Sequence, residues 1–456
     1  MINATVIISS AITLLLVTAI GAYSLRRVKT ASDFSVGGNR MGPLLIAGAM
    51  IGSFVGGGAT IGTAELAFKT GFSAWWFTLG GGIACLILGF FLYKPFRASG
   101  LSTAPQILAA EYGSQIQPLA CLSASVGTFL GVISQVLSIV ALLHSMFGLG
   151  TYLAAVAAVI LVCFYVIFGG IWGAGIIGII KTVMINVSFL AAGLLAFYLI
   201  GGTQGIMAFP SYPWLSVFGR GVATDVAAGF SVIVGVLSTQ IFLQTILSAR
   251  DARSARIGAV ISAFFIIPIG LAGVLIGLFM QSHAPHISPR DALPLFILNY
   301  MPSWLGGVIW AVLLISAVGT AAGLVLGIST SLSQDIYKKV FRPNASDAEI
   351  LRMTRILIVS VTVLALISLR GFLNSFILQW NFLSMGLRGA TLFFPLLATI
   401  FLHKRIKPLA GRMSIALAPA AVILWSIFFR NLIDPLYIGM GVSFLILFSG
   451  LGKRIK

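Results

Sequence analysis

The stretch from Met41 to Gly71, MGPLLIAGAMIGSFVGGGATIGTAELAFKTG, decides the fold of this chain. It is apolar and long enough to cross a bilayer, but its middle holds three consecutive glycines, Gly56 to Gly58, between the hydroxyls of Ser53 and Thr60. Each glycine costs a helix interior about 1 kcal/mol relative to alanine, so the stretch predicts a membrane helix that unwinds at its centre. Such breaks expose backbone to ions and substrate in many secondary transporters. Alternatively, the small residues only let neighbouring helices pack closely.

The rest of the chain is equally apolar. Of its 456 residues 59% are hydrophobic and 8% are charged, whereas about 25% charged is usual in soluble proteins. The composition therefore predicts an all-α polytopic membrane protein embedded in the lipid bilayer. A formal charge of +18 could suit a nucleic-acid partner, but basic cytoplasmic loops explain it more simply, and we expect no nucleic-acid partner.

Thirteen apolar runs are long enough to span. We expect the N-terminus outside, so that an odd number of spans puts the C-terminus in the cytoplasm. Of the 28 Lys and Arg residues, 21 then fall in inner segments and five in outer ones, which favours this orientation in a plasma (inner) membrane. The last two, Lys181 and Arg388, lie inside predicted spans. The runs cover residues 4–25, 42–69, 73–94, 118–147, 152–168, 174–201, 225–249, 257–281, 304–337, 352–369, 372–402, 412–429 and 433–450.

A second interrupted run is the seventh span, in which Gly229 and Gly235 precede a polar Ser238–Gln240 segment. Paired interrupted segments in corresponding positions of two halves point to a transporter site. Spans 2–6 and spans 7–11 therefore form two predicted halves of opposite orientation, each beginning with a broken helix. The predicted units are residues 1–41 (first span and inner loop), 42–201 (first repeat), 202–402 (second repeat) and 403–456 (spans 12 and 13).

Five groups of short motifs lie in order along these spans. They are Ser32-Asp33-Phe34 with Gly37-Gly38-Asn39-Arg40; Gly169-Gly170-Ile171-Trp172; Gln240 and Gln244 with Leu247–Arg250; Thr320-Ala321 with Ser329-Thr330 and Asp335-Ile336-Tyr337; and His403-Lys404-Arg405 with Gly411. Together they resemble the sodium:solute symporter family over nearly the whole length of the chain. The resemblance implies the leucine-transporter-type fold with its five-plus-five inverted repeat.

The resemblance also implies a cation site between the second-span break and the ninth span. Its carried-over positions are Gly52, Val55, Ser316, Gly319 and Thr320. Backbone carbonyls survive any side-chain change, and Thr320 keeps its hydroxyl. Gly319, however, stands where the family usually has a second hydroxyl.

Two acidic positions of the family are also replaced. Ile177-Gly178 stands in place of a Thr-Asp pair in the sixth span, and Ala322 replaces the Asp that follows the ninth-span Thr-Ala. These departures weaken the case for sodium. We expect no organic cofactor, and either a sodium ion or a proton as coupling ion.

Lys181 lies where the family usually has Gln, three residues after Gly178 and hence on nearly the same helix face. If the resemblance holds, that face looks towards Thr320 and the second-span break. The ammonium would then occupy the space of sodium, an arrangement that resembles sodium-independent members of the amino acid–polyamine–organocation group. Buried lysines can release their proton, which would give proton coupling or plain exchange. The alternative is that Lys181 snorkels to the cytoplasmic surface.

The resemblance places a small organic substrate beside the second-span break, facing the third, seventh and eleventh spans. Ala59, Thr78 and Gly235 stand where sugar-carrying relatives hold carboxylate, amide and tyrosine groups, which disfavours a sugar. The candidate substrate-binding residues are Ser53, Phe54, Ala59, Thr60, Phe77, Thr78, Gly235, Thr239 and Arg388.

Arg388 falls about halfway along the eleventh span, where an unpaired charge costs about 2.5–3.5 kcal/mol even on a lenient insertion scale. With few buried acids available, a carboxylate-bearing substrate is a natural counter-ion. The alternative is an arginine satisfied by carbonyls at a helix break.

Glu65 is the other charged residue of note, with Lys69 four residues later. It predicts either a helix-end ion pair with Lys69 or a proton carrier or outer gate.

These observations favour a secondary active transporter that works by alternating access. A proton-coupled or ion-independent exchanger or uniporter is the first alternative. A channel is another, and so is a sensor module, although the chain ends at Lys456 directly after a span. We do not expect an enzyme, because the spans hold no cluster of His, Asp or Glu suited to catalysis or metal binding.

Overall fold

The computed structural model describes residues 3–25, 41–99, 104–369, 371, 373, 375–429 and 433–452, without the side chains of residues 18–25 and 168–180. Three predicted features lie outside this description: the Ser32–Arg40 motifs, the side chains of Gly169–Trp172, and those of Ile177 and Gly178.

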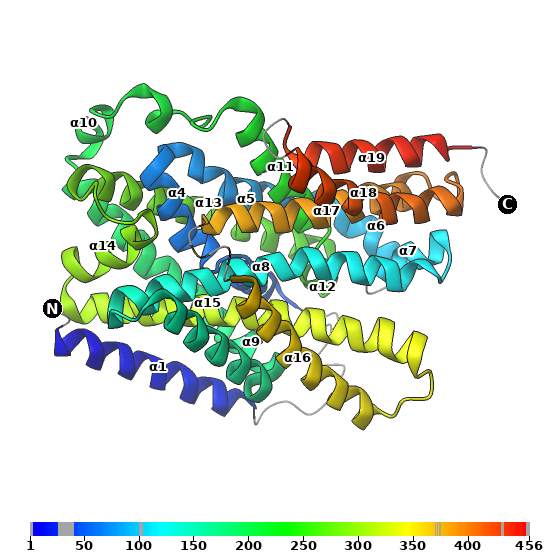
Figure 1. Cartoon of the computed structure of the whole chain (residues 1–456), viewed down its shortest axis with the longest axis horizontal. Coiled ribbons are helices and arrows are strands. Elements are labelled where there is room, and N and C mark those ends of the chain that lie inside the picture. Colours follow the sequence, from blue (N-terminus) through cyan, green and yellow to red (C-terminus); the bar gives the residue numbers. More distant parts are fainter. Residues whose placement is uncertain are drawn as a thin grey trace.

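The described residues form helices and connecting turns, with two isolated β-bridges and no β-strand. Most helices run along the long axis of the molecule, and Figure 1 shows the two chain termini at opposite ends of it. We call these ends the N-terminal face, which holds α10 and α14, and the C-terminal face, which holds α6 and α7. The helices are α1 (Ala4–Leu25), α3 (Pro43–Phe54), α4 (Thr63–Thr70), α5 (Trp76–Ile87), α6 (Tyr93–Ala98), α7 (Ala104–Tyr112), α8 (Ile116–Phe147), α9 (Thr151–Leu199), α10 (Gly202–Met207), α11 (Val222–Leu237), α12 (Gln240–Leu247), α13 (Ala252–His283), α14 (Ala292–Tyr300), α15 (Ser303–Ser331), α16 (Asp347–Leu369), α17 (Ile377–Phe401), α18 (Pro408–Phe428) and α19 (Pro435–Ser449).

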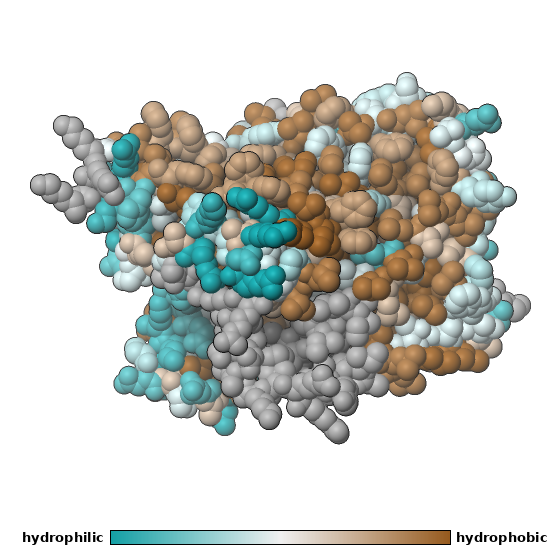
Figure 2. Space-filling model, turned by 180° about the vertical axis from the view of Figure 1, so that it is seen from behind, coloured by the Kyte–Doolittle hydropathy of each residue, from teal (hydrophilic) through white to brown (hydrophobic). Residues whose placement is uncertain are grey.

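The surface matches a protein immersed in lipid. In Figure 2, apolar residues cover most of the visible side, and hydrophilic residues gather towards the C-terminal face and beside the grey residues. Within the described ranges, eight helices are long and apolar enough to cross a membrane, and the bent pair α11–α12 makes nine. Four shorter apolar helices lie in the predicted spans 1, 2, 5 and 13. The protein is therefore a multi-pass membrane protein, and the count of thirteen spans stays a prediction.

The predicted break in the second span is confirmed. Helix α3 ends at Phe54, and Val55 is extended, with φ −80° and ψ 94°. The π-helical segment η2 (Gly58–Gly62) then leads into α4. The chain thus loses regular α-helical bonding at the glycine run, where helix formation is least favourable.

The second predicted break is also confirmed. Helices α11 and α12 meet at an angle of 54°, and Thr239 between them is extended, with φ −91° and ψ 125°. The side chain of Thr239 donates to the carbonyl of Gly235 at 2.6 Å, which helps to satisfy the interrupted turn.

Helix α13 packs closely against the first broken helix through glycines. A β-carbon on Gly258 would lie 2.8 Å from Ile46 of α3, and one on Gly277 would lie 2.6 Å from the carbonyl of Ala64 of α4. Small residues allow such close backbone approach in membranes, where packing rather than the hydrophobic effect holds helices together. Both halves of the broken span are therefore held by one helix.

The predicted pair of Glu65 and Lys69 is wrong. Glu65 is buried, and its Oε1 lies 3.4 Å from Nε of Arg290 in the short 3-10 segment η6 (Pro289–Asp291). Its Oε2 accepts from the backbone N–H of Ile377, the first residue of α17, at 2.8 Å. Lys69 is exposed. Spacing of four residues along α4 could not reveal a partner 225 positions away in the sequence.

Replacing Glu65 by Ala should lower the free energy of unfolding by about 3–5 kcal/mol, because it leaves the largely buried charge of Arg290 bonded to the carbonyls of Leu373 and Ser375 without its carboxylate partner. Equilibrium unfolding in detergent measures this value. Lys69→Ala is the matched control and should change it by less than about 0.5 kcal/mol. Equal effects of the two substitutions would contradict the assignment of Arg290 as the partner.

Candidate functional site

The side chain of Lys181 enters the first break. It is 5% exposed, and its ammonium donates three hydrogen bonds: to the carbonyl of Gly52 at 3.0 Å, the carbonyl of Ser316 at 3.1 Å and the hydroxyl of Thr320 at 2.9 Å. These bonds use all three donors of the group. The alternative that Lys181 snorkels to a membrane surface is therefore wrong, since its charged end points into the bundle.

The break explains why the carbonyl of Gly52 is available. In a continuous helix this carbonyl would bond to the N–H of Gly56, but that N–H donates to Phe54 instead, at 3.1 Å. The C-terminal end of a helix also carries partial negative charge, which favours a cation there. The neighbouring carbonyl of Val55 accepts from the hydroxyl of Ser316 at 2.8 Å. Helices α3 and α15 are thereby joined at the site.

The surroundings of the ammonium are polar but carry no formal charge. Helices α3 and α15, which supply its three oxygen partners, contain no titratable residue. No carboxylate forms an ion pair with Lys181 in the part of the chain that the structure describes. Gly319 supplies no side-chain group, although nothing lies within 4 Å of where its β-carbon would be. Only neutral dipoles therefore balance the charge.

The glycine run permits both unwinding and close packing, so the two alternatives raised by the sequence hold together. Polar side chains from three different helices approach the three glycines so closely that no larger residue would fit at these positions. A β-carbon would lie 2.8 Å from Thr320 Oγ1 at Gly56, 2.2 Å from Ser138 Oγ at Gly57 and 2.1 Å from Asn381 Nδ2 at Gly58.

Arg388 lies at the second break and is 4% exposed. Its Nη1 donates to Thr239 Oγ1 at 2.9 Å, its Nε to the carbonyl of Ser384 at 3.1 Å, and its Nη2 to Ser384 Oγ at 3.0 Å and Met385 Sδ at 3.2 Å. Only one of these partners is a carbonyl, and none is charged. Among the described residues, no carboxylate pairs with Arg388.

Aromatic rings lie between α3, α5, α12 and α17. Phe54 stacks on Phe77 with centroids 5.0 Å apart, Phe77 meets Phe382 at 5.8 Å, and Phe54 meets Phe242 at 6.4 Å. We call these four residues the aromatic layer. Two of them, Phe54 and Phe77, are sequence candidates, and they contact each other directly.

The remaining sequence candidates do not form one group. Ser53 donates to Ala49 of its own helix at 2.7 Å, and Thr60 donates to Gly56 at 3.0 Å, across the break. Thr78 donates to Trp75 at 3.3 Å and faces α13, where a β-carbon on Gly270 would lie 1.8 Å from its hydroxyl. Ala59 is fully buried, and Gly235 packs against Met385.

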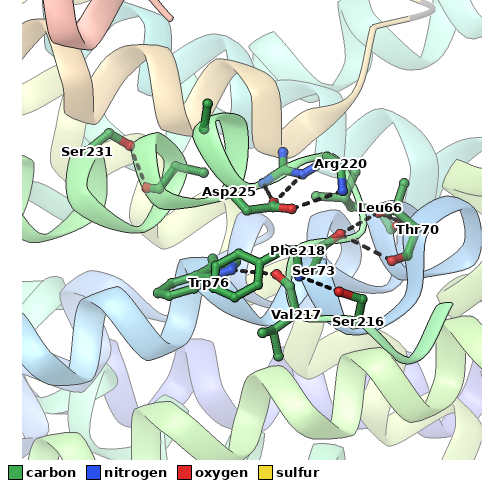
Figure 3. Close-up of polar contacts among 12 residues, drawn as sticks. Leu66, Thr70, Ser73, Trp76, Ser216, Val217, Phe218, Arg220, Asp225 and Ser231 are labelled. Carbon is green, nitrogen blue, oxygen red and sulfur yellow. Dashed lines mark hydrogen bonds and ion pairs between the residues drawn. The ribbon is translucent and has the colours of Figure 1, made fainter. Parts of the chain in front are cut away.

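The segment before α11 contacts the start of α5 and one member of the aromatic layer, Phe382. Trp76 Nε1 donates to the carbonyl of Val217 at 2.7 Å, and its ring lies 5.8 Å from that of Phe218 (Figure 3). Arg220 forms an ion pair with Asp225 at 2.6 Å, and its guanidinium lies 5.2 Å from the ring of Phe382. A cation over an aromatic face is attracted by the ring quadrupole.

Sequence reasoning missed Gln135 and Asn381. Gln135 of α8 accepts from the N–H of Gly57 at 2.8 Å, and Asn381 of α17 donates to Ser134 of α8. A signal was present, because an amide inside an apolar run must find partners once it is in the membrane. The identity of those partners depends on helices far apart in the sequence.

Two broken helices whose breaks present polar groups inside an all-helical membrane bundle define a secondary membrane transporter. The chain belongs to the sodium:solute symporter family, whose model matches residues 34–410.

Relatives agree with this assignment. The chain is 24% identical over 367 residues to the uncharacterized symporter YwcA of Bacillus subtilis (strain 168), covering 76% of this chain and 71% of the relative. Its fold is similar to that of a Na+-coupled sialic acid symporter, with a TM-score of 0.76, 17% identity and coverage of 99% of this chain and 97% of the other. It is also similar to MhsT, solved with L-phenylalanine, at a TM-score of 0.54, 14% identity and 90% and 98% coverage. The predicted leucine-transporter-type fold is confirmed.

Replacing Gly57 by Ala should lower the free energy of unfolding by about 1–3 kcal/mol, the usual cost of overpacking, because the new methyl group would overlap Ser138. Thermal unfolding in detergent measures the change. Adding Ser138→Gly should restore part of the loss. Gly323→Ala on α15, where nothing lies within 4 Å, is the control, and an equal loss in both single variants would refute the packing explanation.

Proposed function

We propose that this protein is a secondary active transporter of a small carboxylate-bearing solute, in which the Lys181 ammonium takes the place of a sodium ion. The observation that carries the proposal is the set of three hydrogen bonds from Lys181 to Gly52, Ser316 and Thr320. The family resemblance assigns the same three positions to a bound cation. An ammonium and a sodium ion carry the same charge, so one can substitute for the other at these oxygens.

The bound ammonium also disfavours a second cation. A sodium ion at the same oxygens would lie beside the ammonium and be repelled by it. The oxygens are neutral, and no carboxylate among them would offset the second charge. The missing hydroxyl at Gly319 removes a further sodium ligand. Transport is therefore sodium-independent, and it is driven either by a proton gradient, with Lys181 losing and regaining its proton, or by exchange of one solute for another.

Arg388 is the proposed counter-ion of the solute. A buried guanidinium that bonds only to neutral groups retains an uncompensated charge, and its planar fork suits bidentate binding of a carboxylate. Thr239, which accepts from Arg388, immediately precedes α12, whose N-terminal end carries partial positive charge. Both features favour an anion at the second break. The aromatic layer offers apolar contacts for the rest of the solute.

Alternating access requires two parts that move relative to each other. We assign these to the repeats at residues 42–201 and 202–402, with residues 1–41 and 403–456 at the periphery. In the plasma membrane, the excess of basic residues in predicted inner segments supports an N-terminal face outside and a C-terminal face in the cytoplasm. Glu65 and Arg290 then hold the start of α17 on the outer side, as an outer gate would.

Proteoliposomes with sodium and proton gradients imposed separately test the role of Lys181. Uptake of a panel of labelled acids, such as acetate, pyruvate and benzoate, should be unaffected by sodium and should fall at least about tenfold in Lys181→Ala, which corresponds to roughly 1.4 kcal/mol. Lys94→Ala, at an exposed lysine, is the control. Uptake that needs a sodium gradient and persists in Lys181→Ala would refute the proposal.

Arg388→Ala should weaken the apparent affinity for every transported acid by about tenfold or more, because it removes a charged hydrogen-bond partner worth about 1.5–3 kcal/mol. Arg388→Lys keeps the charge but loses the bidentate fork and should fall between. Competition for exchange by unlabelled acids measures the affinities. If Arg388→Ala leaves them all unchanged, the guanidinium is a structural group that Thr239 and Ser384 satisfy.

A further inference from the structure

Helix α8 runs past both breaks with one face of small and polar residues. They recur at spacings of three and four, which places them on the same side of the helix. At one end of this face, a β-carbon on Gly127 would lie 2.6 Å from the side chain of Arg388, and at the other, Ser138 meets Gly57. The residues of this face are Gly127, Gly131, Ser134, Gln135 and Ser138.

Gln135 is the member of this face that bonds to the first break. Its Oε1 accepts from the N–H of Gly57 at 2.8 Å, and the side chain is 4% exposed. A β-carbon on Gly56 would lie 2.7 Å from this oxygen and 2.8 Å from Thr320 Oγ1. Thr320 in turn accepts from Lys181 at 2.9 Å. Two side chains thus bond to the first break or its neighbours: Lys181, through Gly52 and Thr320, and Gln135, through Gly57.

The hydrogen bond of Gln135 has a clear energetic reason. Unwinding removes regular helical partners from the backbone, and an unsatisfied N–H at membrane depth costs several kcal/mol. The amide oxygen supplies the acceptor that Gly57 needs. Gln135 therefore fixes the unwound backbone at Gly57 to α8. Any movement of this backbone acts on α8.

The other end of the α8 face is attached to Arg388. Ser384 Oγ donates to the carbonyl of Gly127 at 2.6 Å and accepts from Arg388 Nη2 at 3.0 Å. Between the two ends, Asn381 donates to Ser134 and presses on Gly58. Helix α8 is thereby bonded to the first broken helix through Gln135 and to α17 through Ser134 and Gly127.

We infer that Gln135 is a positioning residue that transmits the state of Lys181 to the substrate side of the site. The inference rests on the proposed function. While Lys181 bonds to Gly52 and Thr320, the unwound backbone at Gly56 and Gly57 stays against Gln135. When the ammonium leaves these oxygens, Gly56 and Gly57 shift and pull on α8, whose face contacts Asn381 and Arg388. Without the Gln135 bond, the unwound backbone still moves, but α8 does not move with it.

A double-mutant cycle between Lys181→Ala and Gln135→Leu tests the link, read out by hydrogen–deuterium exchange of the α8 peptide that covers residues 127–138 in nanodiscs. In the wild-type background, Lys181→Ala should raise exchange in this α8 peptide at least about fivefold, the lower end of typical coupling between sites. In the Gln135→Leu background, where the bond is already absent, the same change should add less than about twofold.

Gln379→Leu, at an exposed glutamine of α17, is the matched control and should leave the effect of Lys181→Ala intact. If Gln135→Leu does not fold, Gln135→Asn, which withdraws the amide from Gly57, replaces it in the same cycle. Effects that simply multiply would overturn the inference, because they would show two independent structural roles.

A transport readout separates this inference from the proposed function. Gln135→Leu should keep equilibrium exchange of the acid that the wild type exchanges fastest, within about threefold, while gradient-driven accumulation falls about tenfold. A parallel loss of both activities would also overturn the inference. If wild-type uptake requires sodium, the proposed function fails, whatever the double-mutant cycle by hydrogen–deuterium exchange shows for Gln135.

Discussion

The rest of the structure depends on one interaction, the Lys181 ammonium held by Gly52, Ser316 and Thr320. A buried charge without an acidic partner costs several kcal/mol unless dipoles surround it. Here the broken end of α3 and the intact α15 supply those dipoles. The glycine run is therefore not simply a weak point of a helix. It frees the carbonyl that the ammonium binds, and it lets neighbouring polar side chains approach the backbone.

Among the described residues, two basic side chains are buried, Lys181 and Arg388, and the groups that they bond to are polar but neutral. Lys181 marks the first break and Arg388 the second, and no described carboxylate pairs with either. An anionic solute complements such a site better than a cation or a zwitterion does. The nearest buried acid on the first broken helix, Glu65, is occupied by Arg290 and the start of α17. The proposal therefore assigns Glu65 and Arg290 to the outer gate and the region between the breaks to the solute.

The sequence predicted both breaks because the cost of glycine in a helix is local. The family resemblance predicted that Lys181 faces Thr320, because it places Gly178 on the side of the cation site and three residues along a helix return to nearly the same face. The partners of Glu65 and the contacts of Gln135 and Asn381 could not be predicted, since they join helices that approach only in the folded protein. Arg388 was recognised as exceptional, and its contacts with Ser384 and Met385 lie within one turn of α17, but its contact with Thr239 depends on the packing of α11 against α17.

The most direct test of the central claim is equilibrium binding of labelled sodium to the purified protein in nanodiscs. If the Lys181 ammonium occupies the cation position, the wild-type chain binds no sodium in a saturable way, at any substrate concentration. Saturable binding of sodium to the wild type that is lost in Thr320→Ala would contradict the account, because it would show a functional sodium site where the lysine is proposed to substitute for the ion.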